Sequence, residues 1–317
     1  MVPRNADNMM RIAIAGAGGL ARVFAHYIHE TAHQVVILSR QPRPELEALD
    51  YTVLVVNYDS QTELRHALRG IDLVISTVSG NPQINLMDAA AHAEVTRFVP
   101  AEFEGPPSRR PRNDPVDRGR AACLERLRHW SRHNRHPMPS TIFTCGIFYE
   151  RFARGGLGSM DIGASSNCYY PGSYLMNIEA STADIVETTT SGNPISVAMT
   201  SVNDVAMFIV AALDLGIENW PGEFRMQGDR KTVTEIIQYA ESVKGGTPFE
   251  TDVIQARDLT THLDHASYYQ DYSKVARIQE LIATEQRRYD FTQPNLNALV
   301  NVVPTSFWNW LHSVWGI

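Results

Sequence analysis

A glycine-rich turn near the start of the chain has the residue spacing that most clearly suits chemistry. Residues 11–21 read RIAIAGAGGLA, so G-x-G-x-x-A follows a short apolar run. Such a turn lets backbone amides at the start of a helix bind a pyrophosphate. We expect these contacts from Gly16, Gly18, Gly19, Leu20 and Ala21. A turn that binds nothing is the alternative, but the place between an apolar run and a helical pattern favours a dinucleotide.

The end of the next apolar run indicates which dinucleotide would bind. A site for NAD usually has Asp or Glu there, to accept hydrogen bonds from the ribose 2′-hydroxyl. This chain has Ser39 and Arg40, and a guanidinium beside a hydroxyl suits a 2′-phosphate. We therefore expect NADP(H), with a solvated Arg40 as the alternative. Two later loops are expected to add contacts, to the adenine and to the pyrophosphate and nicotinamide ribose, respectively: Asn57 and Tyr58, then Thr77, Val78 and Ser79.

Carboxylates and tyrosines in the middle of the chain are the candidates for chemistry on a substrate. A desolvated carboxylate from Glu102, Glu104 or Glu150 can shuttle a proton or stabilise a cation. A solvated or salt-bridged surface group is the alternative for each, and it is favoured for Glu104 and Glu150. Tyr149 or Tyr169 is a candidate donor to a carbonyl. The aromatic residues also suit a flat or cationic substrate, although core packing uses the same residue types. The expected substrate contacts are Phe103, Phe148, Glu150, Tyr169 and Tyr174.

Histidines and arginines raise two further questions about ligands. The eleven histidines include no HExxH pattern, so we expect no metal site. Between Arg109 and Arg135 there are nine arginines and three acidic residues, which gives this segment a local charge of +6. A solvated helix and loop explain that excess, and attraction of an anionic cofactor or substrate is the functional alternative.

Regularly alternating elements must position these residues. Apolar runs that predict strands occur at residues 11–15, 34–39, 52–56, 73–77, 97–100 and 141–145, with helical patterns at 20–30, 61–68 and 81–93. Ser60-x-x-Glu63 predicts a capping box, and Asn81-Pro82 predicts an N-cap followed by the first helical residue. Strands that are apolar on both faces and separated by helices indicate a parallel sheet covered on both sides. The predicted fold class is α/β, a Rossmann-type doubly wound sheet.

The second half of the chain follows a different rhythm. A strand is predicted at residues 195–199, a helix at 203–213, and a capping box at Thr232-x-x-Glu235 opens a helix to about residue 243. We expect a smaller C-terminal α+β substrate lobe, with an NADP-binding domain at 1–150 and the lobe at 151–317, their contacts interleaved. Three C-terminal tryptophans are expected to seal this lobe or an oligomer contact: Trp308, Trp310 and Trp315.

Composition restricts the classes of protein that the chain can represent. Its 317 residues are 44% hydrophobic and 20% charged with a net charge of −7, which is typical of globular proteins and argues against a general nucleic-acid binder. Three cysteines without close spacing exclude a disulfide framework. The N-terminal residues lack the apolar core of a signal peptide, and no run suits a membrane span. We expect a cytoplasmic monomer or homodimer that binds a small molecule.

The segment RFVPAEFEG, residues 97–105, resembles the signature of NmrA-like and isoflavone-reductase-like proteins, which are atypical short-chain dehydrogenases. The glycine turn, Arg40, GIDLVIST ending at Thr77 and TSVNDVA from Thr200 agree with it. The resemblance implies a Rossmann domain with a small C-terminal substrate lobe and an active site in the cleft between them. It also implies an NADPH-dependent reductase of plant or fungal specialised metabolism.

The chain departs from that family at the residue that usually delivers a proton. Family reductases place a Lys on the helix after the signature, where this chain has Arg120, with Arg118 nearby. The three lysines are all later, at Lys231, Lys244 and Lys274, and no Tyr-x-x-x-Lys pair occurs. Because Arg has a very high pKa, it donates a proton poorly near neutral pH.

Three functions follow from this departure. The default prediction is reduction of a polarised C=N, C=C or C=O bond in an aromatic or alkaloid-like molecule, catalysed with help from Glu102, Arg120 or Tyr149. An iminium ion would need no acid, because it is already electrophilic. The first alternative is a non-redox cyclase, for example of the Pictet–Spengler type, that retains NADP as a structural ligand. The second is an NADP-sensing regulatory protein.

Overall fold

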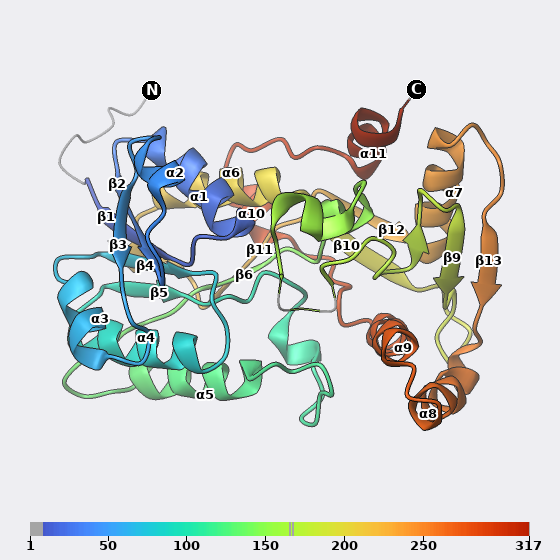
Figure 1. Ribbon diagram of the computed structural model, residues 1–317, viewed down its shortest axis with the longest axis horizontal. Helices are drawn as coiled ribbons and strands as arrows, with labels where there is room; N and C mark the ends of the chain where they lie inside the picture. Colours follow the sequence, from blue (N-terminus) through green and yellow to red (C-terminus); the bar gives the residue numbers. More distant parts are fainter. Residues whose placement is uncertain (1–8, 165, 167, 317) are drawn as a thin grey trace. The chain divides into compact units, whose positions relative to one another are not determined.

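The computed structural model describes residues 9–164, 166 and 168–316, and the chain packs as two compact units (Figure 1). Unit 1 contains residues 1–102, 117–143 and 206–224, and unit 2 contains residues 103–116, 144–205 and 225–317. The chain passes between the units more than once, so neither is a continuous segment. The predicted functional division at residue 150 stays a prediction.

Unit 1 contains a five-stranded parallel sheet in the order β3-β2-β1-β4-β5. Its strands are β1 (Arg11–Ala15), β2 (Gln34–Ser39), β3 (Thr52–Val55), β4 (Leu73–Ser76) and β5 (Arg97–Val99). The strand order reverses beside β1, because the chain crosses from β3 to β4 on the other side. The Rossmann-type α/β fold predicted from the alternating apolar runs is thereby confirmed, since a central parallel sheet with this order defines such folds.

Helices cover both faces of this sheet. The short helix α2 (Pro44–Glu47) belongs to this unit. Its longer helices include α1 (Gly19–His29), α3 (Gln61–Ala67), α4 (Asn81–His92) and α5 (Arg120–Ser131). Figure 1 shows α3, α4 and α5 together on one side of the strands and α1 on the other. On the first side, Leu64 and Leu86 join Ala13 and Val74 in one buried cluster. Alternate strand residues therefore face opposite helical layers.

Two details of this unit differ from the sequence predictions. The strand expected at residues 141–145 forms as β6 (Ile142–Thr144) but pairs with β11 (Glu223–Arg225) in a separate two-stranded sheet. Only an isolated bridge between Phe98 and Ser140 continues the parallel order beyond β5. The N-cap of α4 is Gly80 and not Asn81, because Gly80 has φ +68° and the helix already begins at Asn81.

The two predicted capping boxes have different outcomes. At α7, Thr232 accepts from the Glu235 amide and Glu235 accepts from the Thr232 amide, so the full box is confirmed. At α3, Ser60 accepts from the Glu63 amide at 3.3 Å, but the Glu63 carboxylate accepts from the Asn57 amide instead. The second box is therefore only half formed, since its carboxylate closes the preceding turn.

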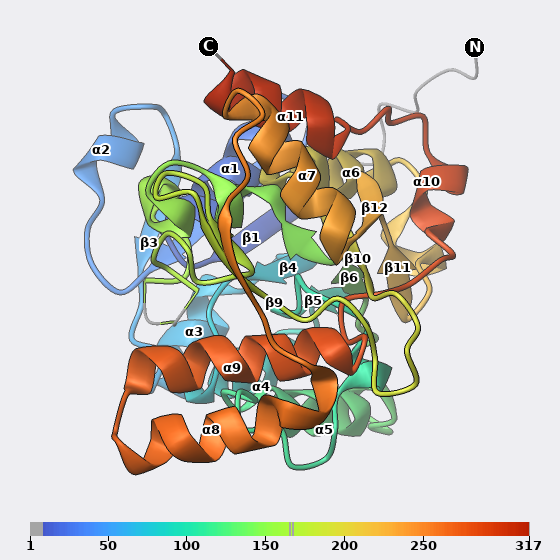
Figure 2. The ribbon, with the colours of Figure 1, turned by 90° about the vertical axis from the view of Figure 1, so that its right-hand side faces the viewer.

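Unit 2 contains two three-stranded sheets with helices packed on them. Their orders are β12-β10-β7 and β13-β9-β8. The strands are β7 (Ile147–Phe148), β8 (Met176–Asn177), β9 (Thr182–Ile185), β10 (Ser196–Thr200), β12 (Asp229–Thr232) and β13 (Glu250–Val253). The helices are α7 (Val233–Val243), α8 (Leu259–Tyr268), α9 (Tyr272–Glu285), α10 (Asn295–Leu299) and α11 (Phe307–Trp315), and α6 (Val202–Leu213) begins here and ends in unit 1. Figure 2 shows α8 and α9 side by side.

The C-terminal helix closes the core of unit 2. Trp310 and Trp315 of α11 are buried in a cluster with Phe307, whereas Trp308 is 36% exposed. Ser306 caps the helix by accepting a hydrogen bond from the Asn309 amide. Two of the three tryptophans therefore seal the unit that carries them. None of the described helices has the length and apolar character that crossing a membrane requires.

Candidate functional site

The glycine turn after β1 has a backbone that only glycine adopts easily. Gly16 has φ +109°, and a Cβ built there would collide with the Oγ1 of Thr77. The Thr77 amide and hydroxyl both donate to the carbonyl of Ala15, each at 2.8 Å. The loop after β4 is thus fastened directly against the turn, and the fit depends on the missing side chain of Gly16.

The start of α1 supplies amide donors beside this turn. Its N-cap is Gly18, which has extended backbone and no side chain to cap the helix. The amides of Gly19, Leu20 and Ala21 precede the hydrogen bonds within a helix, and they lie at the positive end of its dipole. Ala21 is buried and packs the helix close to the sheet. These residues are candidates for binding the pyrophosphate of a dinucleotide, because the N-cap Gly18 has no side chain that could accept hydrogen bonds from the amides.

The end of β2 lies against the same turn. The carbonyl of Leu38 accepts from the Gly16 amide at 2.9 Å and from the Tyr58 hydroxyl at 3.1 Å. Burial raises the pKa of Tyr58, and the positive charge of Arg40 acts in the opposite direction. Arg40 itself is exposed, and Ser39 is buried with its hydroxyl accepting from the Gln41 amide. The structure therefore brings Gly16, Arg40 and Tyr58 together at one edge of the sheet.

Three other predicted cofactor residues differ in whether they already form hydrogen bonds within the protein. Asn57 uses its side-chain oxygen to accept from the Asp59 amide at 2.9 Å, which starts the turn into α3. The carbonyl of Val78 accepts from the Ser76 hydroxyl at 2.9 Å, so this loop is held by its own strand. Ser79 is exposed. Asn57 thus acts locally as a turn residue, while Val78 and Ser79 shape the loop after β4.

Glu102 lies in a buried polar group that sequence reasoning described only in part. It is 1% exposed and follows β5. The side chain of Gln83 accepts from the neighbouring Ala101 amide at 2.7 Å. Burial raises the pKa of Cys123, a hydrogen bond with Gln83 opposes this, and the charge of Glu102 adds to it. Gln83 and Cys123 come from two different helices, so no local spacing in the sequence signals this group.

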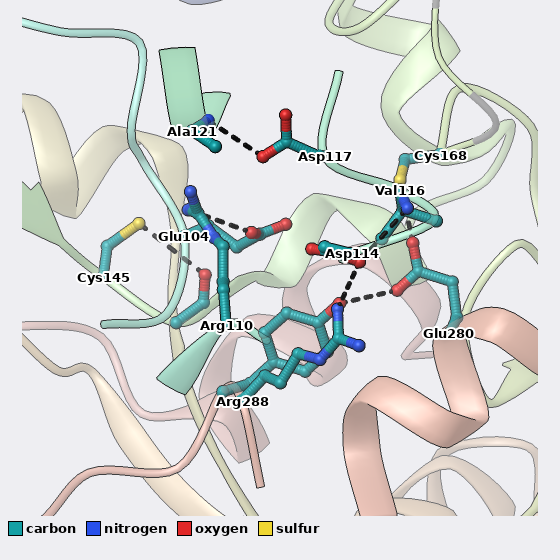
Figure 3. A network of polar contacts seen from close by, with 12 residues as sticks. Glu104, Arg110, Asp114, Val116, Asp117, Ala121, Cys145, Cys168, Glu280 and Arg288 are labelled. Carbon is teal, nitrogen blue, oxygen red and sulfur yellow. Dashed lines mark hydrogen bonds and ion pairs between the residues drawn. The ribbon is translucent and has the colours of Figure 1, made fainter. Parts of the chain in front are cut away.

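Arg120 is the first residue of α5 and lies near the loop after β4. It follows Arg118 and Gly119, which both have positive φ, at +51° and +78°. A Cβ on Gly119 would lie 3.5 Å from the Cα of Gly80, and the Asp117 side chain accepts from the Ala121 amide at 2.9 Å (Figure 3). The helix start that carries Arg120 is therefore adjacent to the loop predicted to run beside the nicotinamide ribose.

Several aromatic residues expected to contact a substrate form the core of unit 2. Tyr149 is fully buried, its ring packs against Phe307 and Trp310, and its hydroxyl donates to the Thr305 carbonyl at 3.1 Å. Burial raises the pKa of Tyr149, with nearby acidic residues adding to it. Tyr174 is also fully buried. Both hydroxyls are engaged in internal hydrogen bonds, since Thr284 donates to that of Tyr174 at 3.1 Å.

Glu150 caps a helix from within the same unit. Its two carboxylate oxygens accept from the Val202 amide at 3.1 and 3.0 Å, at the start of α6. Burial raises the pKa of Glu150 to about 7 despite these hydrogen bonds. Asp204, whose pKa is also raised by burial, accepts from the Thr305 amide at 3.0 Å. Glu150 can thus exchange a proton near neutral pH, although its oxygens face a helix end.

The remaining predicted substrate residues belong to unit 2 and differ in how far they are exposed. Phe103 and Phe148 are each 9% exposed, and Tyr169 is half-buried with its ring edge-on to Tyr170. The segment after the signature is fixed by ion pairs, from Arg110 to Glu104 at 3.4 Å and from Arg288 to Asp114 at 2.7 Å (Figure 3). Of this set, Tyr169 leaves the largest part of its ring accessible to a ligand.

The model of the NmrA-like family matches residues 8–310, almost the whole chain. This protein belongs to the NmrA-like family. The resemblance inferred from residues 97–105 is thereby confirmed. The described residues contain no group of three or more His, Cys, Asp or Glu that could hold a metal ion.

Proteins similar to this NmrA-like protein occur both among curated proteins and among solved structures. Among curated proteins, the oxidoreductase swnR of Metarhizium robertsii is 36% identical over 101 residues, which are 30% of this chain and 33% of that protein. The chain therefore matches about a third of the length of that relative. Among solved structures, an isoflavone reductase superposes with a TM-score of 0.70 at 17% identity, covering 96% of this chain and 99% of the other.

Two further structures contain a bound cofactor. The triphenylmethane reductase of Citrobacter, complexed with NADP(H), has a TM-score of 0.66 at 14% identity and covers 96% of this chain and 99% of its own. The leucoanthocyanidin reductase of Vitis vinifera, complexed with NADPH, has a TM-score of 0.66 at 18% identity and covers 96% and 98%. At these identities the likeness establishes the shared fold.

Proposed function

We propose that this NmrA-like protein is an NADPH-dependent oxidoreductase acting on an aromatic or alkaloid-like small molecule. The observation that carries the proposal is the turn at Gly16, whose φ of +109° and close approach to Thr77 require glycine, and which leads into a helix whose N-cap, Gly18, has no side chain to cap it. Two structural neighbours with this fold bind NADP(H) or NADPH, and the curated relative is named an oxidoreductase.

Each part of the cofactor has candidate contacts in unit 1. The amides of Gly18, Gly19 and Leu20 would hold the pyrophosphate. Arg40, exposed at the end of β2 and close to Tyr58, would hold the 2′-phosphate, with Ser39 beside it. When bound, NADPH supplies a hydride. We infer that the protein residues orient the cofactor and polarise the acceptor.

The substrate class is proposed from chemistry and from relatives. The neighbours are named for aromatic compounds, namely isoflavones, triphenylmethanes and leucoanthocyanidins. The acceptor would be a polarised C=N, C=C or C=O bond. Arg120 would stabilise negative charge that develops during reduction, and Glu102 would hold or move a proton close to it. We also expect the protein to work in the cytoplasm.

Titration of the purified protein with NADPH and NADH tests the cofactor assignment. Arg40→Asp should weaken NADPH binding by about tenfold or more, because a carboxylate repels the 2′-phosphate, and should change NADH binding far less. Arg43→Asp is the matched control, since Arg43 lies in the same segment and pairs with Glu45 at 3.6 Å. Equal loss of both nucleotides on Arg40→Asp would contradict the proposal.

A non-redox cyclase is the second candidate function. It is favoured by the buried carboxylate of Glu102 next to a helix that begins with Arg120 in place of lysine. Incubation with NADPH and a panel of aromatic amines, aldehydes and quinones separates the candidates. Stoichiometric oxidation of NADPH supports the reductase, and product without oxidation supports the cyclase. Tight NADPH binding without any product, together with capture of a protein partner, would support a regulator.

A further inference from the structure

A basic hollow of about 1150 Å³ lies on unit 1 and shares no residue with the predicted cofactor site. We call it the His–Arg hollow. It is lined by His92, Ala121, Glu125, Arg128, His129, Arg132, His133, Asn134, Arg135 and His136. They come from the last residue of α4, from α5 and from the loop that follows α5. The proposed oxidoreductase function makes no use of this surface.

The periodicity of α5 explains why its charges gather there. Cys123, Leu127 and Trp130 recur every three or four residues and are buried against the sheet. Ala121, Glu125 and Arg128 follow the same spacing on another side of the helix, Arg132 continues it at the C-cap, and all four line the hollow. Because residues three or four apart lie on one face, Arg128 and Arg132 stand one turn apart, about 6 Å along the helix.

Four histidine rings form the wall of the hollow. The ring of His92 lies 5.3 Å from that of His136, and the rings of His133 and His136 are stacked at 5.8 Å. His129 lies 5.7 Å from His133. The indole of Trp130 packs against three of these rings, and its N–H donates a hydrogen bond to Asp88 at 2.7 Å. The wall therefore presents several flat rings that carry ionisable nitrogens.

The arginines of the hollow are not neutralised by the protein. Within the described part of the chain, no carboxylate lies in ion-pair distance of Arg128, Arg132 or Arg135. The nearby Asp88 is taken by Arg126 at 3.3 Å and by Trp130. Glu125 is the one acidic residue in the lining. The hollow is thus positive on a protein whose net charge is −7, and it attracts anions locally.

We propose that the His–Arg hollow binds a polyphosphate anion, meaning two or more linked phosphates, as a second ligand site of this protein. Two arginines whose backbone positions are one helical turn apart can bind linked phosphates better than a single one, and Arg binds phosphate through paired hydrogen bonds. The ligand would be either the phosphate chain of a nucleoside triphosphate or an inorganic polyphosphate. The imidazole rings would strengthen binding when protonated and would stack on a base where one is present.

His92 gives this site a pH dependence with a defined direction. Burial, Arg65 and His136 lower the pKa of His92, Asp88 raises it and His133 lowers it again. His129, Glu125 and the three arginines are the other ionisable groups of the lining. Protonation therefore adds positive charge only below neutral pH. Affinity for a polyphosphate should therefore rise as the pH falls below about 6.5, where His92 gains its proton.

Calorimetric titration with inorganic triphosphate, ATP and monophosphate tests the proposal. Triphosphate and ATP should bind about tenfold more tightly than monophosphate, because they engage both arginines at once. Arg128→Gln with Arg132→Gln should weaken triphosphate by about tenfold or more, while NADPH binding is kept. Arg69→Gln is the matched control, since it removes one exposed charge of unit 1 outside the hollow.

The outcomes of this experiment distinguish an inorganic phosphate chain from a nucleoside triphosphate, and they define the results that overturn the proposal. Equal affinity for triphosphate and ATP means that the phosphate chain alone is recognised, and tighter ATP means that the base stacks on the imidazoles. Triphosphate binding that the double variant leaves unchanged, or that saturating NADPH abolishes, overturns the proposal. Binding of a short oligonucleotide without binding of either triphosphate also overturns it. Because NADPH is titrated separately, failure here leaves the cofactor assignment intact.

Discussion

The hydroxyl of Tyr58 and the amide of Gly16 donate to the same carbonyl, that of Leu38, at 3.1 and 2.9 Å. The two donors come from different loops, one after β3 and one after β1. A single acceptor at the end of β2 therefore ties both loops together. This relationship gives Tyr58 a positioning role, because it fixes the turn without a need to contact the adenine.

Tyr58→Phe tests that positioning role. It removes one hydrogen bond and keeps the ring, so the free energy of unfolding should fall by about 0.5–1.5 kcal/mol. NADPH affinity should fall by less than tenfold, because the amides of α1 stay in place. Urea denaturation and fluorescence titration measure the two effects. Tyr51→Phe is the control, since Tyr51 is half-exposed in the same unit. A loss of affinity above about a hundredfold would mean that the hydroxyl binds the cofactor itself.

Gly16→Ala should damage cofactor binding far more than it damages folding elsewhere. The new Cβ would meet the Thr77 hydroxyl at a backbone angle of +109°, where a side chain costs about 1–3 kcal/mol. The loop after β4 must then move away from the turn. We expect NADPH affinity to fall by about tenfold or more, while circular dichroism shows retained structure.

Gly192→Ala separates strain from crowding. Gly192 has φ +79°, and nothing lies within 4 Å of a Cβ built there. This variant introduces backbone strain without a steric clash, and it should leave NADPH affinity unchanged. If Gly16→Ala binds NADPH as well as the unaltered protein does, the turn does not hold the cofactor.

Glu150 should make stability depend on pH in the opposite direction from an ordinary carboxylate. Burial raises its pKa in the folded protein to about 7, above the unfolded value of 4.5, so the folded state holds the proton more strongly. Its contribution is complete below about pH 4.5 and is lost as the pH rises through about 7. The change in the free energy of unfolding that Glu150→Gln causes should therefore be more favourable at about pH 8 than at about pH 5, by on the order of 1–3 kcal/mol.

Glu235→Gln is the control with the opposite sign. Hydrogen bonds from the Thr232 amide and hydroxyl lower the pKa of Glu235, so its contribution exists above the unfolded pKa and is lost as the pH falls. Urea denaturation at several pH values compares the two variants. A stability difference for Glu150→Gln that stays constant with pH would show that the carboxyl titrates normally.

Much of unit 1 could be predicted because its strands are apolar on both faces. Runs such as residues 11–15 and 73–77 therefore indicated a parallel sheet, and β1 (Arg11–Ala15) matches its predicted bounds. The carboxyl ends of β1, β2 and β4 meet in such a sheet. For this reason Gly16, Arg40 and Thr77, which are far apart in the sequence, could be assigned to one site.

The parts that sequence reasoning missed depend on contacts between elements. The aromatic residues Tyr149 and Tyr174 have the same composition whether they line a ligand site or fill a core, and here both are fully buried. Gln83 and Cys123 meet near Glu102 only because α4 and α5 pack together. The His–Arg hollow arises in the same way, since His92 of α4 completes a wall built by His129 of α5 and by histidines of the loop that follows α5.

Arg120→Lys introduces the residue that the family resemblance predicts at this position, and it tests how the proposed reductase would work without a lysine there. Lys donates a proton far more readily than Arg, so reduction of a carbonyl substrate should become faster by about a hundredfold, the lower end of the range that a general acid supplies. Reduction of an iminium substrate should not change, because it needs no acid. Steady-state rates of NADPH oxidation with both substrates measure this, and Arg118→Lys is the control at the neighbouring charge. Equal acceleration of both substrates would show that the lysine acts by orienting the cofactor and not by donating a proton.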